Sequence, residues 1–160
     1  MTKLSRFACV ILGFGVIILA ASAVSAQKAN DDAVPVMTEF RGIKIGMPAK
    51  DVENTIKKDA AAKDDKGFYF TFSEDEAAQV ALDADNNVSA ISAMYFKVDA
   101  ATPKIGDVFG KAATAKPEAD GHIYQMIRYP KAGYWISYNR TGGDSPMVTI
   151  TMQKIPADEQ

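Results

Sequence analysis

The sequence predicts an α+β fold in which tandem helix-plus-antiparallel-meander repeats pack short helices on a curved antiparallel sheet. Three observations lead to this prediction. A short amphipathic helix pattern occurs twice, once after Pro48 and again after Pro103. Each pattern is followed by runs of strand signals separated by turn residues. Sequential hairpins between these runs account for nearly every apolar residue of the second half, which favours a meander.

The N-terminus has the pattern of a secretory signal peptide. Lys3 and Arg6 precede an apolar run at 7–23, and Val-Ser-Ala at 24–26 supplies the small residues that a signal peptidase requires. A transmembrane anchor is the alternative, but the run is at the short end of the roughly 20 residues that a spanning helix needs. We therefore expect cleavage after residue 26, no stable membrane span afterwards, and a periplasmic or secreted protein.

Cleavage would change both the charge and the cysteine content. It would leave 160 − 26 = 134 residues, and the net charge would be 16 − 20 = −4 because Lys3 and Arg6 are lost. This balance excludes a strong binder of nucleic acid. Cys9 would be lost as well, so the mature chain would have no thiol and a single imidazole, that of His122. Cysteine nucleophiles are thereby excluded in the mature chain. The pattern disfavours an ordinary structural zinc site, because its usual cysteine and histidine ligands are absent, and we expect no cofactor.

The first ordered elements are expected after a flexible lead at 27–38, whose Asn, Asp, Ala and Pro show no period. Ile43 and Ile45 alternate with polar residues and predict a short half-buried strand. Pro48 suits the first turn of a helix, because its missing N–H has no partner there. The expected face of this helix carries Val52 and Ile56, and Gly67 is its expected stop.

The first repeat, 39–98, then continues with strands at 68–72, 79–83 and 88–98. The residues at 84–87, Ala-Asp-Asn-Asn, predict a tight hairpin turn, because Asn and Asp tolerate positive φ and bond their own backbone.

The second repeat, 99–155, has the same order. Its helix pattern carries Ile105, Val108 and Phe109 at i, i+3 and i+4. Three more strands are expected, at 122–129, 134–139 and 147–155, before a C-terminal tail at 156–160.

The opening stretch Phe-Arg-Gly-Ile-Lys-Ile-Gly-Met-Pro-Ala-Lys-Asp-Val, 40–52, resembles the opening motif of two groups of bacterial envelope modules. These are the barrel-assembly lipoprotein family called BamE or SmpA and the secreted β-lactamase inhibitory proteins. The matching positions are Gly46, Met47, Pro48 and Val52. The pattern at 80–96 is also similar to the hairpin of PepSY-type domains. The resemblance covers about 60 residues of the first half and implies a module that binds another protein with a sheet face.

A calcium-binding interpretation comes from alternate polar residues in the first hairpin. The residues with possible ligand side chains are Asp83, Asp85, Asn87 and Ser89. Two positions depart from a calcium loop, since Val88 replaces the glycine of the bend and Met94 replaces the closing glutamate. A hairpin turn explains the same residues without an ion.

An aromatic group in the second half is the candidate partner-binding site, with Trp135, Tyr124 and Tyr129 as its residues. Strand alternation puts Tyr134 and Tyr138 on the core side and Trp135 on the outer side. Tyr and Trp are frequent anchors of interfaces, because they supply a large contact area at little cost in rotamer freedom. Alternatively, Trp135 covers the sheet or lies beneath the lead segment.

The sequence therefore predicts an exported, non-enzymatic accessory protein that binds an envelope protein or peptide through a sheet surface. A first alternative is a PepSY-like protein that binds a metal ion or small ligand through the 83–89 loop. A second alternative is a hydrolase built on carboxylates, although no local pattern selects an acid and a base. Any histidine-based scheme would have to use His122.

Overall fold

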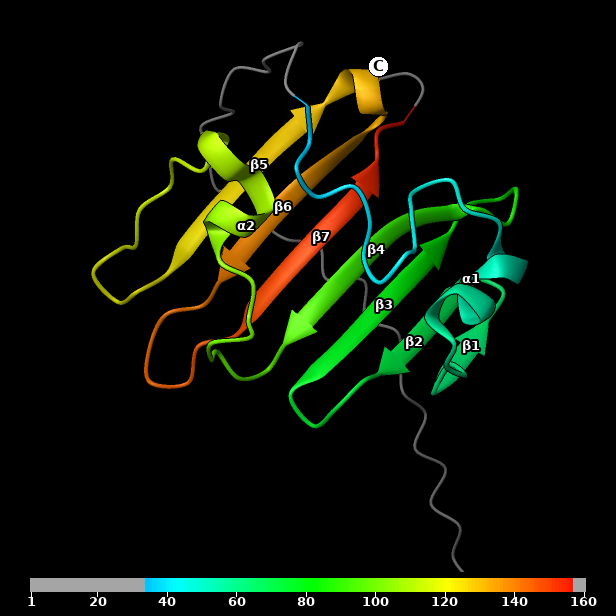
Figure 1. The fold of residues 1–160 in the computed structure, drawn as a ribbon, viewed down its shortest axis with the longest axis horizontal. Helices are drawn as coiled ribbons and strands as arrows, with labels where there is room; N and C mark the ends of the chain where they lie inside the picture. Colours follow the sequence, from blue (N-terminus) through cyan, green and yellow to red (C-terminus); the bar gives the residue numbers. More distant parts are fainter. Residues whose placement is uncertain (1–33, 157–160) are drawn as a thin grey trace, which may run out of the picture.

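The computed structural model describes residues 34–156, which form one antiparallel sheet of seven strands with short helices (Figure 1). The α+β class is therefore confirmed. The strand order is β1-β2-β3-β4-β7-β6-β5. The elements in chain order are α1 (Ala49–Ile56), β1 (Ala62–Asp64), β2 (Gly67–Thr71), β3 (Glu76–Leu82), β4 (Val88–Tyr95), α2 (Ile105–Phe109), β5 (Ile123–Tyr129), β6 (Tyr134–Arg140) and β7 (Val148–Lys154).

Several predicted segments lie outside the described residues. They are the signal peptide at 1–26, the first part of the lead at 27–33, and residues 157–160 of the tail. Within residues 34–156, no helix has the length and apolar character that crossing a membrane requires.

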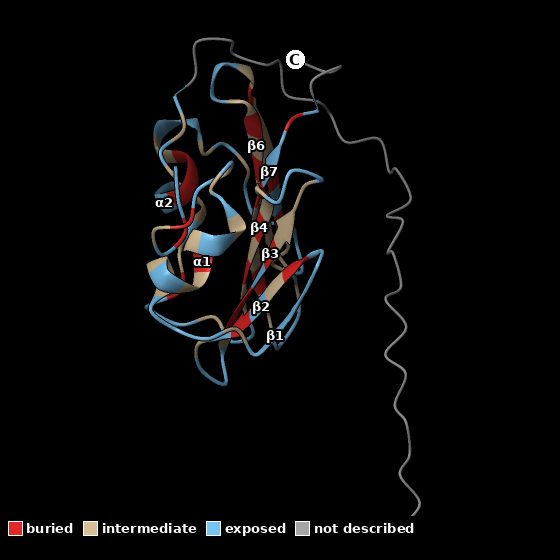
Figure 2. Cartoon of the chain, turned by 90° about the vertical axis from the view of Figure 1, so that its right-hand side faces the viewer, coloured by how far each residue is buried: buried red, intermediate tan, exposed pale blue. Residues whose placement is uncertain are grey.

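Both helices lie on one face of the sheet (Figure 2). The buried apolar side chains join residues of each helix to residues of the strands. Two apolar clusters form there, one under each half of the sheet. Ile136 and Met152 belong to the cluster under β5 to β7, whereas Phe70 and Ile91 belong to the cluster under β2 to β4. Three side chains pack against both clusters: Met37, Ile45 and Tyr95.

The two halves of the chain meet at the β4–β7 pair. Ile91 is opposite Met152 in this antiparallel ladder, and Ala93 is opposite Ile150. All four side chains are at most 1% exposed. The sheet is therefore continuous across the middle of the chain, although the paired residues are about 60 positions apart.

Helix α1 begins after Pro48, as predicted, and buries Val52 completely. It ends much earlier than expected. Lys57 adopts a left-handed conformation, with φ 57°, and its N–H donates to the carbonyl of Glu53. This αL ending closes the helix. Gly67 is therefore not the helix stop and instead begins β2, after the additional short strand β1.

The stretch around Arg41 was predicted to be extended, and this prediction is wrong. Phe40 and Ile43 exchange two main-chain hydrogen bonds of 2.9 Å across a two-residue turn. Arg41 and Gly42 both have positive φ, 51° and 85°, as a type I′ turn requires. The Arg41 guanidinium donates to Glu76 at 2.7 Å and lies 4.2 Å from the centre of the Phe72 ring. These contacts offset the strain of a left-handed arginine.

Most of the other strands match their predictions within a few residues. Phe68, Phe70 and Phe72 share one face, and neighbouring rings stack at 6.1 Å. The 84–87 connection is the predicted hairpin turn, and Asn86 takes positive φ, 59°.

Candidate functional site

The face of the sheet opposite the helices is the candidate functional site, and we call it the open face. Figure 2 shows that, within the described part of the chain, neither helix lies on this side. Its side chains follow from the strand registers and from the alternation with buried residues. On β2 to β7 they are Tyr69, Thr71, Ala77, Gln79, Ala81, Ala90, Ser92, Met94, Tyr124, Met126, Arg128, Trp135, Ser137, Asn139, Thr149, Thr151 and Gln153. On β1, Ala62 and Asp64 lie on the same face.

The open face is almost without charge. Its charged side chains in the described residues are Arg128 on β5 and Asp64 on the short edge strand β1, although about a quarter of all residues are charged. Small and hydroxyl side chains occupy β4 and β7, where the hydroxyl groups of Ser92 and Thr151 lie 3.1 Å apart. Larger side chains flank them, with Tyr69 towards one edge and the aromatic group towards the other. Such a face would fit an uncharged partner surface better than a partner surface that binds through salt bridges.

Two of the three predicted partner-binding residues lie on the open face. Trp135 is partly exposed and lies opposite Arg128 on β5 and Gln153 on β7. Tyr124 is 39% exposed and lies nearer the other end of β5. Met126 lies between Tyr124 and Arg128 on the same side of that strand. Together these side chains make an aromatic and methionine-containing corner of the face.

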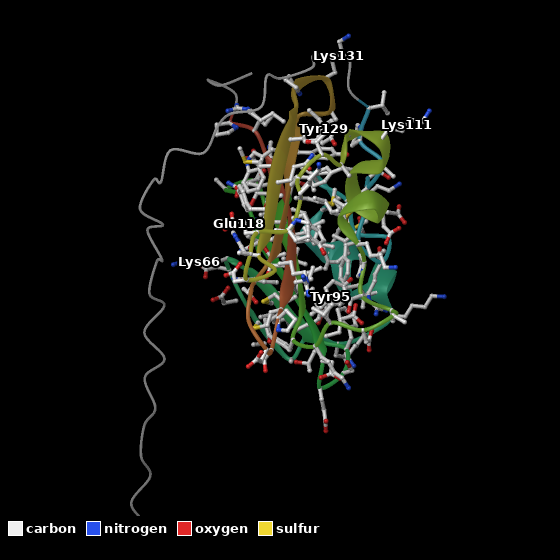
Figure 3. The ribbon with its side chains drawn as sticks, turned by 90° about the vertical axis from the view of Figure 1, so that its left-hand side faces the viewer. Lys66, Tyr95, Lys111, Glu118, Tyr129 and Lys131 are labelled. Carbon is white, nitrogen blue, oxygen red and sulfur yellow. The ribbon has the colours of Figure 1, made fainter. Side chains whose placement is uncertain are left out.

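Tyr129 does not belong to that corner. It is only 2% exposed, and its ring lies 6.3 Å from the Tyr134 ring on the helix side of the sheet. Figure 3 shows it directed towards α2. Burial raises the pKa of both tyrosines. The correction follows from alternation, because odd-numbered residues of β5 face the core. We therefore remove Tyr129 from the predicted binding residues.

The predicted ion-binding residues lie in the β3–β4 hairpin, where Asp83 organises the turn. Its Oδ1 accepts the N–H groups of Asp85 and Asn87 at 3.1 and 3.0 Å. Its Oδ2 lies 3.0 Å from Nζ of Lys154, at the end of β7. Residues 34–156 contain no group of three acidic, histidine or cysteine side chains suited to a metal ion. The Asp83 carboxylate thus already has partners within the fold.

We expect the charge of Asp83 to stabilise the fold in a pH-dependent manner. Hydrogen bonding from the Asn87 main chain, then from Lys154, lowers the pKa of Asp83. A lowered folded-state pKa gives stability that is fully present above the unfolded value, 3.8, and is lost as pH falls through the folded value. Asp83→Asn, which keeps the Oδ1 acceptor, should lower Tm at neutral pH. The difference from the native protein should shrink below about pH 4, as measured by thermal melts across pH.

A pH-independent difference would show that geometry rather than charge gives Asp83 its effect. Calcium at about 1 mM, a concentration suited to extracellular sites, should leave Tm unchanged. A rise in Tm that Asp83→Asn abolished would restore the ion-binding interpretation.

A hollow of about 470 Å³ at one end of the sheet bears on the hydrolase hypothesis. It is lined by the carboxylates of Asp75, Glu76 and Asp99, among other groups. Glu76 is paired with Arg41, and Oδ1 of Asp99 accepts main-chain N–H groups of the following turn. Two of the three carboxylates therefore hold the walls of the hollow in place.

Two carboxylates outside the hollow have a lowered pKa. Hydrogen bonding from Lys63 lowers the pKa of Glu53, in the same direction as that of Asp83. A general acid at neutral pH needs the opposite shift.

His122 lies at the start of β5, with Nε2 3.2 Å from Oδ1 of Asn139 and Nδ1 3.4 Å from Oε1 of Glu118. These two contacts hold the imidazole ring of His122 in a fixed orientation.

Comparisons with known proteins found no matching family model, no matching curated protein and no matching solved structure. The resemblance to BamE, to the β-lactamase inhibitory proteins and to PepSY domains therefore stays a prediction.

Sequence reasoning missed most of the open face. Met126 and Arg128 were not singled out, Met94 was considered only as a position of a calcium loop, and Tyr69 was treated only as part of a strand. The alternation that separates Trp135 from Tyr134 applies equally to β5 and would have found Met126 and Arg128. The position of Met94 beside β7 depends on the β4–β7 pairing, which leaves no local signal.

Proposed function

We propose that this protein is an exported accessory protein that binds an envelope protein or peptide through the open face of the second half, without covalent chemistry. The observation that carries the proposal is the composition of that face. On β5 to β7 its aromatic residues, its methionine and its arginine are types enriched at protein interfaces. Lysine, aspartate and glutamate, which interfaces disfavour, are absent from this part of the face. Trp135 is its expected anchor, because tryptophan is enriched among interface hot spots.

We also propose that the chain consists of two helix-plus-meander repeats. In chain order, α1 precedes β1 to β4, and α2 precedes β5 to β7. Each half has its own apolar cluster, which supports a repeated unit. In this proposal the two units share one sheet, and the second supplies the binding corner.

Trp135→Ala is expected to weaken capture of the partner by about 2 kcal/mol, or roughly thirtyfold. The reason is the loss of the largest side chain of the open face. The purified protein is immobilised, partners are captured from an envelope extract of the source organism, and the affinity of the captured partner is then measured by titration.

Tyr69→Ala is the matched control. Tyr69 lies on the same face at the far side of the sheet and is 36% exposed. Its loss should leave the affinity within about twofold, since it lies outside the proposed contact. Equal binding by native protein and Trp135→Ala, or equal losses in both variants, would contradict the proposed location.

A further inference from the structure

The direction of the hydrogen bonds in β6 determines which main-chain groups of β5 face outward. Ile155 N–H donates to the carbonyl of Gly133 at 2.8 Å, and Thr141 N–H donates to the carbonyl of Met147 at 2.9 Å. Both bonds link an odd-numbered residue that flanks β6, Gly133 or Thr141, to a residue that flanks β7. Successive residues of a strand direct their N–H and C=O groups to opposite sides. The odd-numbered residues of β6 therefore bond to β7, and the even-numbered residues bond to β5.

The β5–β6 register then assigns the two sides of β5. Even-numbered residues of β6 are paired with odd-numbered residues of β5, such as Ile136 with Ile127. The main-chain groups of Tyr124, Met126 and Arg128 consequently point away from β6, at the edge of the sheet. The carbonyl of His122, one step earlier in the same outward series, accepts the Glu118 N–H at 2.8 Å, as this assignment requires.

After His122, the edge is open at Tyr124 and Met126 in the described part of the chain. No hydrogen bond reaches the outward main-chain groups of Tyr124 or Met126 from residues 34–156. Figure 3 looks onto this edge of the sheet. A row of free N–H and C=O groups is a template for pairing with another strand.

The opposite edge of the sheet is protected. Strand β1 has three residues, and two of them, Lys63 and Asp64, are charged. Short length and charge are the usual protections of an edge strand. Strand β5 has seven residues and contains neither proline nor lysine. Arg128 is the last of its residues whose main-chain groups point outward. Only one of the two edges is therefore built to avoid a neighbouring strand.

We propose that an extended segment of the partner pairs with the β5 edge as an eighth strand, bonded to the outward main-chain groups of Tyr124 and Met126. This inference rests on the proposed function, because the added strand would extend the open face beside Tyr124 and Met126. Main-chain bonds to β5 would supply affinity, and alternate side chains would supply specificity.

The side chains around the edge indicate the chemistry of that segment. Ile127 is only partly buried and packs against the apolar cluster on the helix side of the sheet. An apolar side chain of the added strand would cover it. On the other side, Tyr124 and Met126 offer an uncharged contact. The partner segment should therefore be extended, apolar at alternate positions, and free of proline where its N–H groups face β5.

Peptides of about ten residues, long enough to span the edge, are selected from a random library on the purified protein. Met126→Pro removes one outward N–H without removing a bond to β6, because edge positions tolerate proline. We expect it to weaken the selected peptides at least tenfold. Met126→Leu, which keeps the N–H and an apolar side chain of similar size, should bind within about threefold, so the pair isolates the contribution of the main-chain N–H. In the native protein, peptide should slow amide exchange at Tyr124 and Met126 at least tenfold.

Equal binding to Met126→Pro, unchanged exchange at both amides, or failure to select any peptide would overturn the inference. A dimer of this chain dissolved by Met126→Pro would assign the edge to a second copy and overturn it too. Should Met126→Pro fail to fold, amide exchange in the native protein decides alone. The proposed function and this inference can fail separately. If Trp135→Ala loses the captured partner and Met126→Pro retains it, the partner binds the open face and does not pair with the β5 edge.

Discussion

Phe70→Ala is expected to destabilise the protein by about 4 kcal/mol, the largest effect of a single truncation that we predict. The Phe70 side chain is completely buried at the centre of the cluster under β2 to β4. Its ring stacks between those of Phe68 and Phe72, at 6.1 Å from each. Alanine would remove these contacts and leave a cavity, because three rings fixed on one strand cannot close the gap between them.

The same variant tests whether the two apolar clusters unfold together. Met37, Ile45 and Tyr95 pack against both clusters, and the β4–β7 ladder joins the two halves of the sheet. We therefore expect one transition in denaturant for both the native protein and Phe70→Ala, with parallel loss of tryptophan fluorescence and far-ultraviolet circular dichroism. Trp135 reports on the half that does not contain Phe70.

Tyr69→Ala supplies the control for this measurement. Tyr69 is the next residue of β2, lies on the opposite face and is 36% exposed, so its truncation should cost under about 1 kcal/mol. A second transition in Phe70→Ala, with the fluorescence of Trp135 preserved after the first, would show that the halves fold independently.

Local patterns were sufficient where a residue's environment depends on its neighbours in the chain. The alternation of Tyr134 and Ile136 with Trp135 correctly assigned both faces of β6, because a strand has a fixed period of two. Asn86 and its neighbours correctly predicted a hairpin, since asparagine tolerates the left-handed conformation that the turn needs.

The same patterns failed where distant segments decide the outcome. Arg41 takes a turn position that asparagine or glycine usually occupies, and the compensating partners, Glu76 and Phe72, lie more than 30 residues away. Tyr129 was placed on the binding surface because of its residue type, but the face of its strand decides its burial. Strand β5 lies at the edge of the sheet because β7 pairs with both β6 and β4, and no local signal in either strand predicts the β4–β7 pairing.

Gly67→Ala is expected to destabilise the protein by about 3 kcal/mol, although it adds only one methyl group. Gly67 begins β2 with φ 153°, and it lies opposite Ala81 in the ladder with β3. A Cβ atom at this position would overlap the carbonyl oxygen of Val80. That oxygen belongs to the main chain of a central part of the sheet, so the overlap cannot be relieved by a side-chain rotation. The β2–β3 ladder would have to move, and Phe68 and Phe70 would move with it.

Gly106→Ala is the matched control for the added methyl group. Gly106 lies within α2, where a Cβ atom would meet nothing within 4 Å and φ is ordinary. Alanine there should be neutral or should stabilise by about 0.5–1 kcal/mol, because it lowers the backbone entropy of the unfolded chain. Both free energies of unfolding are measured by denaturant titration. If both substitutions changed stability equally, the close approach of Gly67 to Val80 would not be a constraint on the sheet. If only Gly67→Ala is destabilised, glycine is required at the start of β2 because of its close main-chain contact with Val80. The requirement then has nothing to do with the helix stop that the sequence predicted at Gly67.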